Sequence, residues 1–296
     1  MSAVKPLPKT IQIFLPDGNA RSIRIADITS RTVQAIQIPR SKLKEASQRS
    51  EPQSVGVYFL FGEDEEASKS LVYIGEAEDC YHRLKQHHQS KDFWTTAVVI
   101  ISKTSSFTKA HGKYLEWYCI EEATRAGRYT LVNSSTPNKP FISEPVEADL
   151  LDNFETLRVL LSTLGFPVLE EIKRPASARA LLYCTGRGAS GTGEYIEDGF
   201  VVFAGATAAL TETKSAQGSW VTRVRDKLKK ASTLVLSEDG THYEFVRDHV
   251  FNSPSGAAVT ILGRNANGWK SWKNKQGQTL DELERQPAKT EVEAHG

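Results

Sequence analysis

Six side chains between positions 58 and 133 have the types and order that hydrolysis of a phosphodiester bond requires. They are Tyr58, Tyr73, Arg83, His87, Glu116 and Asn133. Such hydrolysis needs an activated water, relief of the negative charge on the phosphate, and stabilisation of the leaving oxygen. Phenol, imidazole, guanidinium and carboxylate groups can supply these functions, so these six positions are the candidate catalytic residues.

Glu116 is the candidate metal ligand. It lies within the apolar run YLEWYCI at residues 114–120, where an unpaired buried carboxylate would be costly. A hard divalent cation offsets that cost, because Mg²⁺ is typically held by one or two carboxylates together with water and phosphate. We therefore expect Mg²⁺ or Mn²⁺ at Glu116. The alternative is an ordinary exposed glutamate on a helix.

Arg83 and the two tyrosines are candidates for binding the phosphate and activating water. A guanidinium is permanently charged and forms paired hydrogen bonds with phosphate oxygens. A phenol ordinarily titrates at about pH 10, and a nearby guanidinium or metal ion would lower that value and let one tyrosine act as a general base. The alternative is that Tyr58 and Tyr73 are packed strand residues and that Arg83 is a solvated surface residue.

Strands and helices must bring these side chains together. The sequence predicts three strands, at residues 55–61, 71–74 and 96–101. Asp79 can cap a helix that runs to about Gln89 and carries Arg83 and His87 on one face. A second helix over about 108–125, which Gly127 can end, carries Glu116, with His111 as a weaker candidate on it.

The motifs Gly56-Val57-Tyr58 and Tyr73-Ile74-Gly75, followed by Arg83, Glu116 and Asn133, resemble those of the GIY-YIG nucleases over about residues 54–135. Val57 replaces the isoleucine of the first motif. The resemblance implies a small three-stranded mixed or antiparallel sheet flanked by helices. It also implies that both tyrosines line the site with Tyr73 favoured as the base, that His87 assists, and that Asn133 orders the site by hydrogen bonding.

One acidic residue, Glu116, occupies a motif position, which favours a one-metal mechanism over a two-metal clamp. One compact site of this kind cuts one strand. A double-strand break would need two protomers or two successive nicks.

The fold class that these patterns predict is α/β (α+β) with separate domains. We expect an N-terminal β-hairpin and connection over 1–48, a nuclease domain over 49–170, a small α+β domain over 176–286 and a disordered tail over 287–296. The hairpin, at residues 10–26, has three open roles: it binds DNA, builds a dimer or extends the sheet.

Basic and aromatic residues in the C-terminal domain are candidates for contacting DNA. They are Arg223, Arg225, Lys227, Lys229, Lys230, Trp269, Lys270 and Trp272. The cations of a basic helix over 219–231 can meet phosphates, and tryptophans interleaved with lysines suit base stacking. The alternative is that the lysines form a solvated face and that the tryptophans are core residues.

Residues 178–285 resemble an uncharacterised domain that is often fused to these nucleases and is similar to restriction-enzyme and adenine-methylase associated modules. The matching stretches are residues 198–202, 251–258 and 263–269. The resemblance implies a DNA contact and the reading of modified bases, without a catalytic signature. Gly186, Gly188 and Gly191 match a dinucleotide-binding fingerprint, but the strand-like run after them favours a hairpin loop.

Composition sets the outer limits. The net charge of +1 means that any basic surface must be local. The three cysteines are scattered, which argues against a disulfide framework or a zinc site and favours a cytoplasmic protein. We expect no signal peptide and no membrane span.

These residues together predict a metal-dependent DNA endonuclease that acts in restriction or DNA processing, with DNA as its partner. Two alternatives share the scaffold: a non-cleaving DNA-binding protein that reads modified bases, and an RNA nuclease. A third is an interaction protein whose hairpin at residues 10–26 forms a homodimer or docks a partner.

Overall fold

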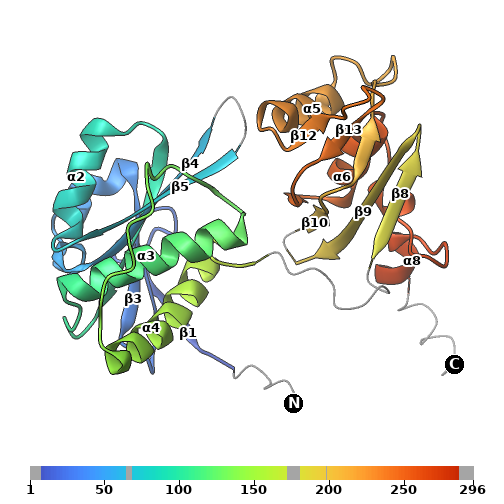
Figure 1. The fold of residues 1–296 in the computed structure, drawn as a ribbon. Helices are drawn as coiled ribbons and strands as arrows, with labels where there is room; N and C mark the ends of the chain where they lie inside the picture. The colour runs from blue at the N-terminus through green and yellow to red at the C-terminus, as the bar shows by residue number, and fades with distance from the viewer. Residues whose placement is uncertain (1–7, 65–68, 172–180, 198, 287–296) are drawn as a thin grey trace, which may run out of the picture. The chain divides into compact units, whose positions relative to one another are not determined.

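The protein is described by a computed structural model that covers residues 8–64, 69–171, 181–197 and 199–286. It divides into two compact units (Figure 1). Unit 1 contains the described residues up to 171, and unit 2 contains those from 181 onward. Each unit mixes helices with sheets, so the predicted α+β class with separate domains is confirmed. The predicted tail at 287–296 lies outside the described residues.

A seven-stranded sheet forms the centre of unit 1. Its strands, in spatial order, are β1 (Ile11–Phe14), β2 (Arg24–Ile28), β3 (Val33–Pro39), β6 (Trp94–Ser102), β4 (Gly56–Asp64), β5 (Lys69–Ala77) and β7 (Thr130–Leu131). All neighbours are antiparallel except β5 and β7, which pair in parallel. The expected three strands are therefore the middle of a larger sheet.

The N-terminal segment supplies the additional antiparallel strands. β1 and β2 form the predicted hairpin, and β2 pairs with β3, which in turn pairs with β6 along its whole length. Of the three roles left open for the hairpin, the structure shows that it extends the sheet. Residues 33–39, which the sequence favours as part of a mixed connection, form the strand that joins the hairpin to the rest.

The two faces of this sheet are covered by different helices, and each face has its own apolar core. α3 (Lys109–Ala126) and α4 (Glu144–Thr163) cover one face, where Val57 of the first motif is fully buried. α1 (Leu43–Ala46) and α2 (Cys80–Ser90) cover the other face. Since successive strand residues point to opposite faces, Tyr58 belongs to the α2 side.

Local capping explains where the site helices begin and end. The Asp79 carboxylate accepts a hydrogen bond of 2.8 Å from the His82 backbone and starts α2, as predicted. Thr108 starts α3, and His111 completes this cap by accepting a hydrogen bond from the Thr108 backbone. Gly127 ends α3 in the left-handed conformation. His111 thus has a structural role.

Unit 2 contains two smaller sheets around one buried helix. The four-stranded sheet has the order β14 (His249–Phe251), β10 (Gly199–Val202), β9 (Ala189–Ile196) and β8 (Leu182–Gly186). The three-stranded sheet has the order β11 (Thr207–Ala209), β13 (His242–Phe245) and β12 (Leu234–Leu236). The helices are α5 (Trp220–Lys230), α6 (Pro254–Leu262), α7 (Gly268–Ser271) and α8 (Leu280–Glu284). α6 is the buried helix and packs against strands of both sheets.

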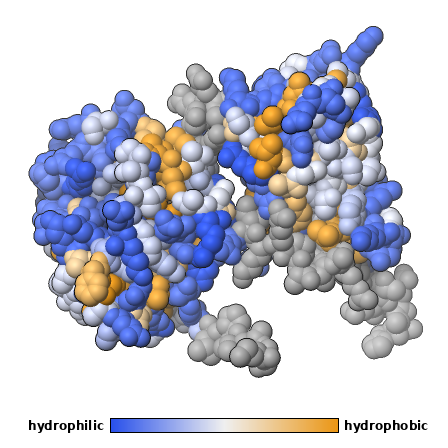
Figure 2. Space-filling view, in the orientation of Figure 1, coloured by the Kyte–Doolittle hydropathy of each residue, from blue (hydrophilic) through white to orange (hydrophobic). Residues whose placement is uncertain are grey.

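The glycine-rich stretch of unit 2 is the turn and second strand of the β8–β9 hairpin, as predicted. Gly186 pairs with Ala189, and no helix starts there. On the face that Figure 2 shows, each unit presents mostly hydrophilic residues with smaller hydrophobic areas. Within the described part of the chain, no helix combines the length and the apolar character needed to cross a membrane.

Gly56 is required by the close approach of β4 to β6. A Cβ added there would lie 2.2 Å from the Ile100 carbonyl oxygen. We expect Gly56→Ala to lower the free energy of unfolding of unit 1 by about 3 kcal/mol or more, because backbone atoms would have to move. Urea unfolding followed by circular dichroism measures this change.

Gly112→Ala is the matched control, because an added Cβ there meets atoms only at ordinary contact distances of 3.5 Å or more. Alanine is also the better helix former. Equal unfolding free energies for Gly56→Ala and the unmodified protein would contradict the packing described for β4.

Candidate active site

The two tyrosines lie side by side on the α2 face of the sheet. Tyr58 of β4 is paired in register with Gly75 of β5, and Leu60 with Tyr73. The tyrosine rings are 6.2 Å apart between centroids and nearly parallel, at 25°. A Cβ at Gly75 would lie 2.3 Å from the Tyr58 hydroxyl oxygen. The glycine of the second motif therefore makes room for the phenol of the first.

A buried hydrogen bond joins Tyr58 to α2. The Tyr58 hydroxyl and His87 Nε2 are 2.9 Å apart, and the two residues are only 1% and 4% exposed. Burial raises the pKa of Tyr58 well above its ordinary value, so its phenol stays protonated. Burial, with smaller contributions from Arg83 and Lys91, lowers the pKa of His87 to about 4. The pair is therefore neutral at neutral pH.

Arg83 links the phenols to solvent. It lies on the exposed side of α2, one turn before His87, and hydrogen bonding to Tyr58 and, more weakly, to Tyr73 raises the pKa of its guanidinium. Its Nη1 also donates a 2.6 Å hydrogen bond to Gln86. A permanent positive charge thus lies at the tyrosine pair and remains accessible to a phosphate.

Lys91 is a further cation at this site that the sequence analysis did not include. Its Nζ lies 4.5 Å from the centroid of the Tyr73 ring, and its positive charge contributes to the low pKa of His87. Its backbone closes α2 with a hydrogen bond to the His87 carbonyl. Arg83, His87 and Lys91 are each four residues apart, which is the helical spacing that could have revealed it.

Glu116 lies beside a second carboxylate, that of Glu76. Burial first, and the negative charge of Glu76 second, raise the pKa of Glu116 to about 7, and the Glu76 backbone N–H donates a hydrogen bond that opposes this shift. Glu76 Oε2 is buried and has no hydrogen-bond partner among the described residues. The sequence analysis did not identify Glu76, because only its position directly after the Tyr73-Ile74-Gly75 motif marks it.

This carboxylate pair fits a hard divalent cation. An orphaned buried carboxylate oxygen beside a glutamate that protonates readily is the donor set that Mg²⁺ or Mn²⁺ would satisfy. The described residues contain no group of three or more His, Cys, Asp or Glu side chains that could hold a metal ion. Water and phosphate oxygens would have to complete the coordination, which is the usual arrangement for Mg²⁺.

Asn133 completes the edge of β5. Its Oδ1 accepts a 3.1 Å hydrogen bond from the Ile74 backbone, and its Nδ2 donates a 2.7 Å bond to the Ile74 carbonyl. β7 itself pairs with β5 only at Leu71 and Val72. The Asn133 carboxamide therefore makes the hydrogen bonds that the backbone of a longer β7 would make. It holds β5 at Ile74, between Tyr73 and Gly75. Its role in this geometry is positioning.

All six predicted residues of unit 1 lie on β5 or on segments that adjoin it, namely β4, α2, α3 and the residues after β7. The charge of Glu116 affects the pKa of Tyr58, and the charge of Arg83 affects the pKa of Glu116, so groups from the two faces of the sheet are within electrostatic reach of one another.

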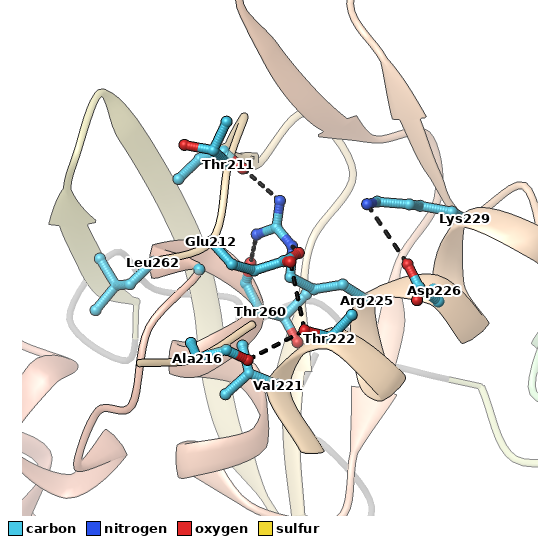
Figure 3. Close-up of polar contacts among 12 residues, drawn as sticks. Thr211, Glu212, Ala216, Val221, Thr222, Arg225, Asp226, Lys229, Thr260 and Leu262 are labelled. Atoms are coloured by element: carbon cyan, nitrogen blue, oxygen red, sulfur yellow. Dashed lines mark hydrogen bonds and ion pairs between the residues drawn. The ribbon is translucent and has the colours of Figure 1, made fainter. Parts of the chain in front are cut away.

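Two of the candidates in unit 2 are not available to a ligand. Arg225 is fully buried, where its guanidinium donates to the carbonyl oxygens of Ala209 and Thr260 and pairs with Glu212 at 3.0 Å (Figure 3). Trp272 is also fully buried and donates to the Pro254 carbonyl oxygen at 3.0 Å. Their burial corrects the expectation that they contact DNA.

The other candidates of unit 2 remain at the surface to different degrees. Arg223, Lys227, Lys230 and Lys270 are exposed. Lys229 is half-buried, pairs with Asp226 at 3.7 Å and lies over the Tyr243 ring. Trp269 is half-buried, with Tyr195 against it and the Arg285 guanidinium 3.4 Å from its centroid.

Comparison with known proteins gives one finding. Residues 182–284, within unit 2, match the model of a family described as "Domain of unknown function (DUF4357)". This match fits the predicted uncharacterised C-terminal domain. No curated protein and no solved structure matches the chain. The resemblance of residues 54–135 to GIY-YIG nucleases is not among these findings, and it stays an interpretation of the motifs.

Lys91 contributes to the low pKa of His87, after burial and Arg83. Replacing it with methionine removes a positive charge that disfavours the imidazolium, so we expect the pKa of His87 to rise from about 4. It should stay below the ordinary value of about 6.5, because the ring remains buried. Titration of the His87 ring signals by NMR measures the shift.

Lys85→Met is the matched control. Lys85 lies on the same helix and is exposed over the Tyr81 ring, and its charge does not contribute to the pKa of His87. Identical His87 titrations in the two variants would show that Lys91 does not lie at the site.

Proposed function

We propose that this chain is a metal-dependent endonuclease that hydrolyses DNA phosphodiester bonds, with unit 1 as the catalytic unit. The observation that carries the proposal is the meeting of Tyr58, Tyr73, Arg83, His87 and Glu116 at the edge of β5 that Asn133 completes. Each function that phosphodiester hydrolysis requires has a group there.

Tyr73 is the tyrosine suited to activate water. Tyr58 is buried, protonated and hydrogen-bonded to His87, so it is not free to accept a proton. Tyr73 is only half-buried, and the guanidinium of Arg83 and the ammonium of Lys91 both lie next to it. A partly exposed phenol beside these two cations is placed to take the proton from an attacking water. Tyr58 and His87 hold the α2 side of the site in position.

Arg83 would bind the phosphate, and the two carboxylates would hold the metal ion. A guanidinium donates two parallel hydrogen bonds to phosphate oxygens and stabilises the charge that develops on them. Glu116 and Glu76 would hold Mg²⁺ or Mn²⁺, which when bound acts as a Lewis acid on the phosphate and the leaving oxygen. One such ion agrees with a site that has one carboxylate pair.

Several broader features belong to the same proposal. We propose that unit 2 contributes DNA recognition, including contact with modified bases, and that restriction or DNA processing is the biological role. Cleavage of both strands would involve a homodimer or two successive nicks. A cytoplasmic location fits the three cysteines, which are all free, buried thiols.

The direct test is cleavage of supercoiled plasmid with Mg²⁺, Mn²⁺ or EDTA. We expect metal-dependent nicking, and we expect Glu116→Gln to reduce its rate by at least about 100-fold, since it removes a metal ligand and the carboxylate charge that a bound cation would pair with. Tyr73→Phe should lower kcat by about 100- to 10,000-fold, as expected for loss of a general base. An RNA substrate of the same length distinguishes the RNA-nuclease alternative.

Glu121→Gln is the matched control, because Glu121 is an exposed glutamate on the same helix. Cleavage that persists in EDTA or in Glu116→Gln would contradict the mechanism. A folded protein that binds DNA and cuts neither DNA nor RNA would support the non-cleaving alternative.

Metal binding itself gives a readout that does not depend on activity. We expect calorimetry to show weaker Mn²⁺ binding by Glu76→Gln and by Glu116→Gln, roughly 10-fold or more for each. Glu78→Gln, which changes an exposed neighbour of the same motif, should bind Mn²⁺ normally. Unchanged binding by Glu76→Gln would exclude Glu76 as a ligand.

A further inference from the structure

The outer face of α5 in unit 2 carries an exposed tryptophan in line with three cations. Trp220 is 42% exposed, and Arg223, Lys227 and Lys230 are exposed as well. Positions 220, 223, 227 and 230 fall on one side of an α-helix and span about 15 Å along its axis. We name these four residues the α5 stripe.

The buried side of α5 fixes the direction in which the α5 stripe faces. Val221, Arg225 and Leu228 are all buried in unit 2. Arg225 connects α5 to the segment after β11 through Glu212 and to α6 through the Thr260 carbonyl oxygen (Figure 3). A buried charge with hydrogen-bond partners on several elements allows little rotation of the helix. The stripe is therefore presented to solvent in a defined orientation.

The positive charge of the stripe is not neutralised locally. In the described part of the chain, no carboxylate pairs with Arg223, Lys227 or Lys230. Asp226, the one acidic residue of α5, pairs with Lys229 at 3.7 Å (Figure 3). Three cations in a row thus remain for a polyanion, which gains affinity by releasing its counterions.

The ring of Trp220 is also open. Among the described residues, no aromatic ring or cation stacks on it, whereas Trp269 has the Arg285 guanidinium on its ring and Tyr195 against it. An open indole beside cations can stack on a nucleic-acid base, but only on a base that is not already stacked in a duplex. A membrane surface fits less well, because the apolar side of α5 lies in the core of unit 2.

We propose that the α5 stripe is a binding site for single-stranded nucleic acid, in which Trp220 stacks on an unpaired base while Arg223, Lys227 and Lys230 contact successive phosphates. The inference rests on the proposed function only in its choice of nucleic acid as the partner. It concerns a site in unit 2 that takes no part in cleavage. The site would hold a strand with unpaired bases.

The test measures binding of the full chain to a fluorescein-labelled oligothymidylate by anisotropy, in EDTA so that nothing is cleaved. Trp220→Ala should weaken binding roughly 5- to 150-fold, and Trp220→Phe should retain most of the affinity. The triple variant Arg223→Gln, Lys227→Gln, Lys230→Gln should reduce the slope of log K against log salt by about 2.

A second triple variant, Arg264→Gln, Lys273→Gln, Lys275→Gln, is the matched control. It removes the same charge from three exposed residues of unit 2 that lie outside α5. It should leave the affinity and the salt slope unchanged. Thermal unfolding of every variant confirms folding, and photocrosslinking to an iodouracil-substituted oligonucleotide should label the peptide that contains Trp220.

The inference would be overturned if Trp220→Ala and the α5 triple variant bound the oligonucleotide as tightly as the unmodified protein, or if only the control triple variant lost affinity. Crosslinks found only outside α5 would also overturn it. So would duplex DNA that competes for binding as well as the single strand does. Binding to vesicles of anionic lipid that depends on the stripe, without oligonucleotide binding, would assign it to membranes instead. Failure of the nuclease proposal is distinguishable, because a protein that cuts nothing can still show all the expected binding results.

Discussion

The hydrogen bond between Tyr58 and His87 is the interaction on which the arrangement of the candidate site depends. It lies in an apolar layer, where an unpaired phenol or imidazole would carry a large desolvation cost. Each group therefore holds the other, and β4 is tied to α2 at a fixed distance. Arg83, one helical turn before His87, and Lys91, four residues after it, are placed beside the tyrosine pair as a result.

The same bond separates the roles of two chemically identical side chains. The tyrosine that is buried and bonded is kept protonated, whereas its neighbour faces two cations and partial solvent. Two chemically identical groups thus have different surroundings. The glycine opposite Tyr58 is part of this constraint, because any side chain there would displace the hydroxyl.

Parts of this arrangement could be predicted from the sequence and parts could not. Strand and helix periods place the two tyrosines, Arg83, His87 and Glu116, and the caps at Asp79 and Gly127 were predictable from residue type. Glu76 was not, because it points to the opposite face of β5 from Tyr73 and only the packing of α3 reveals its neighbour. The hydrogen bonds of Asn133 depend on a chain segment that lies 59 residues from Ile74.

Unit 2 shows how residue type alone can mislead. Arg225 is a basic residue in a basic helix, yet its spacing of four from Val221 and three from Leu228 puts it on the apolar side. The helical periodicity therefore indicated that Arg225 is buried, whereas its charge suggested that it is exposed. The carbonyl oxygens that receive its guanidinium come from elements far away in the sequence, so its burial could not be anticipated in detail.

The short pairing of β7 with β5 has a consequence for the local stability of unit 1. Among the described residues, two residue pairs, a backbone hydrogen bond from Val132 to Val72 and the Asn133 carboxamide attach this segment to β5, whereas β4 pairs with β5 and with β6 through long ladders. Opening of so small an element costs far less free energy than global unfolding. The pairing joins segments that α2, β6 and α3 separate in the sequence, and such long-range contacts form slowly in folding. Local opening of β7 would release Asn133 from Ile74 while β5 stays paired with β4.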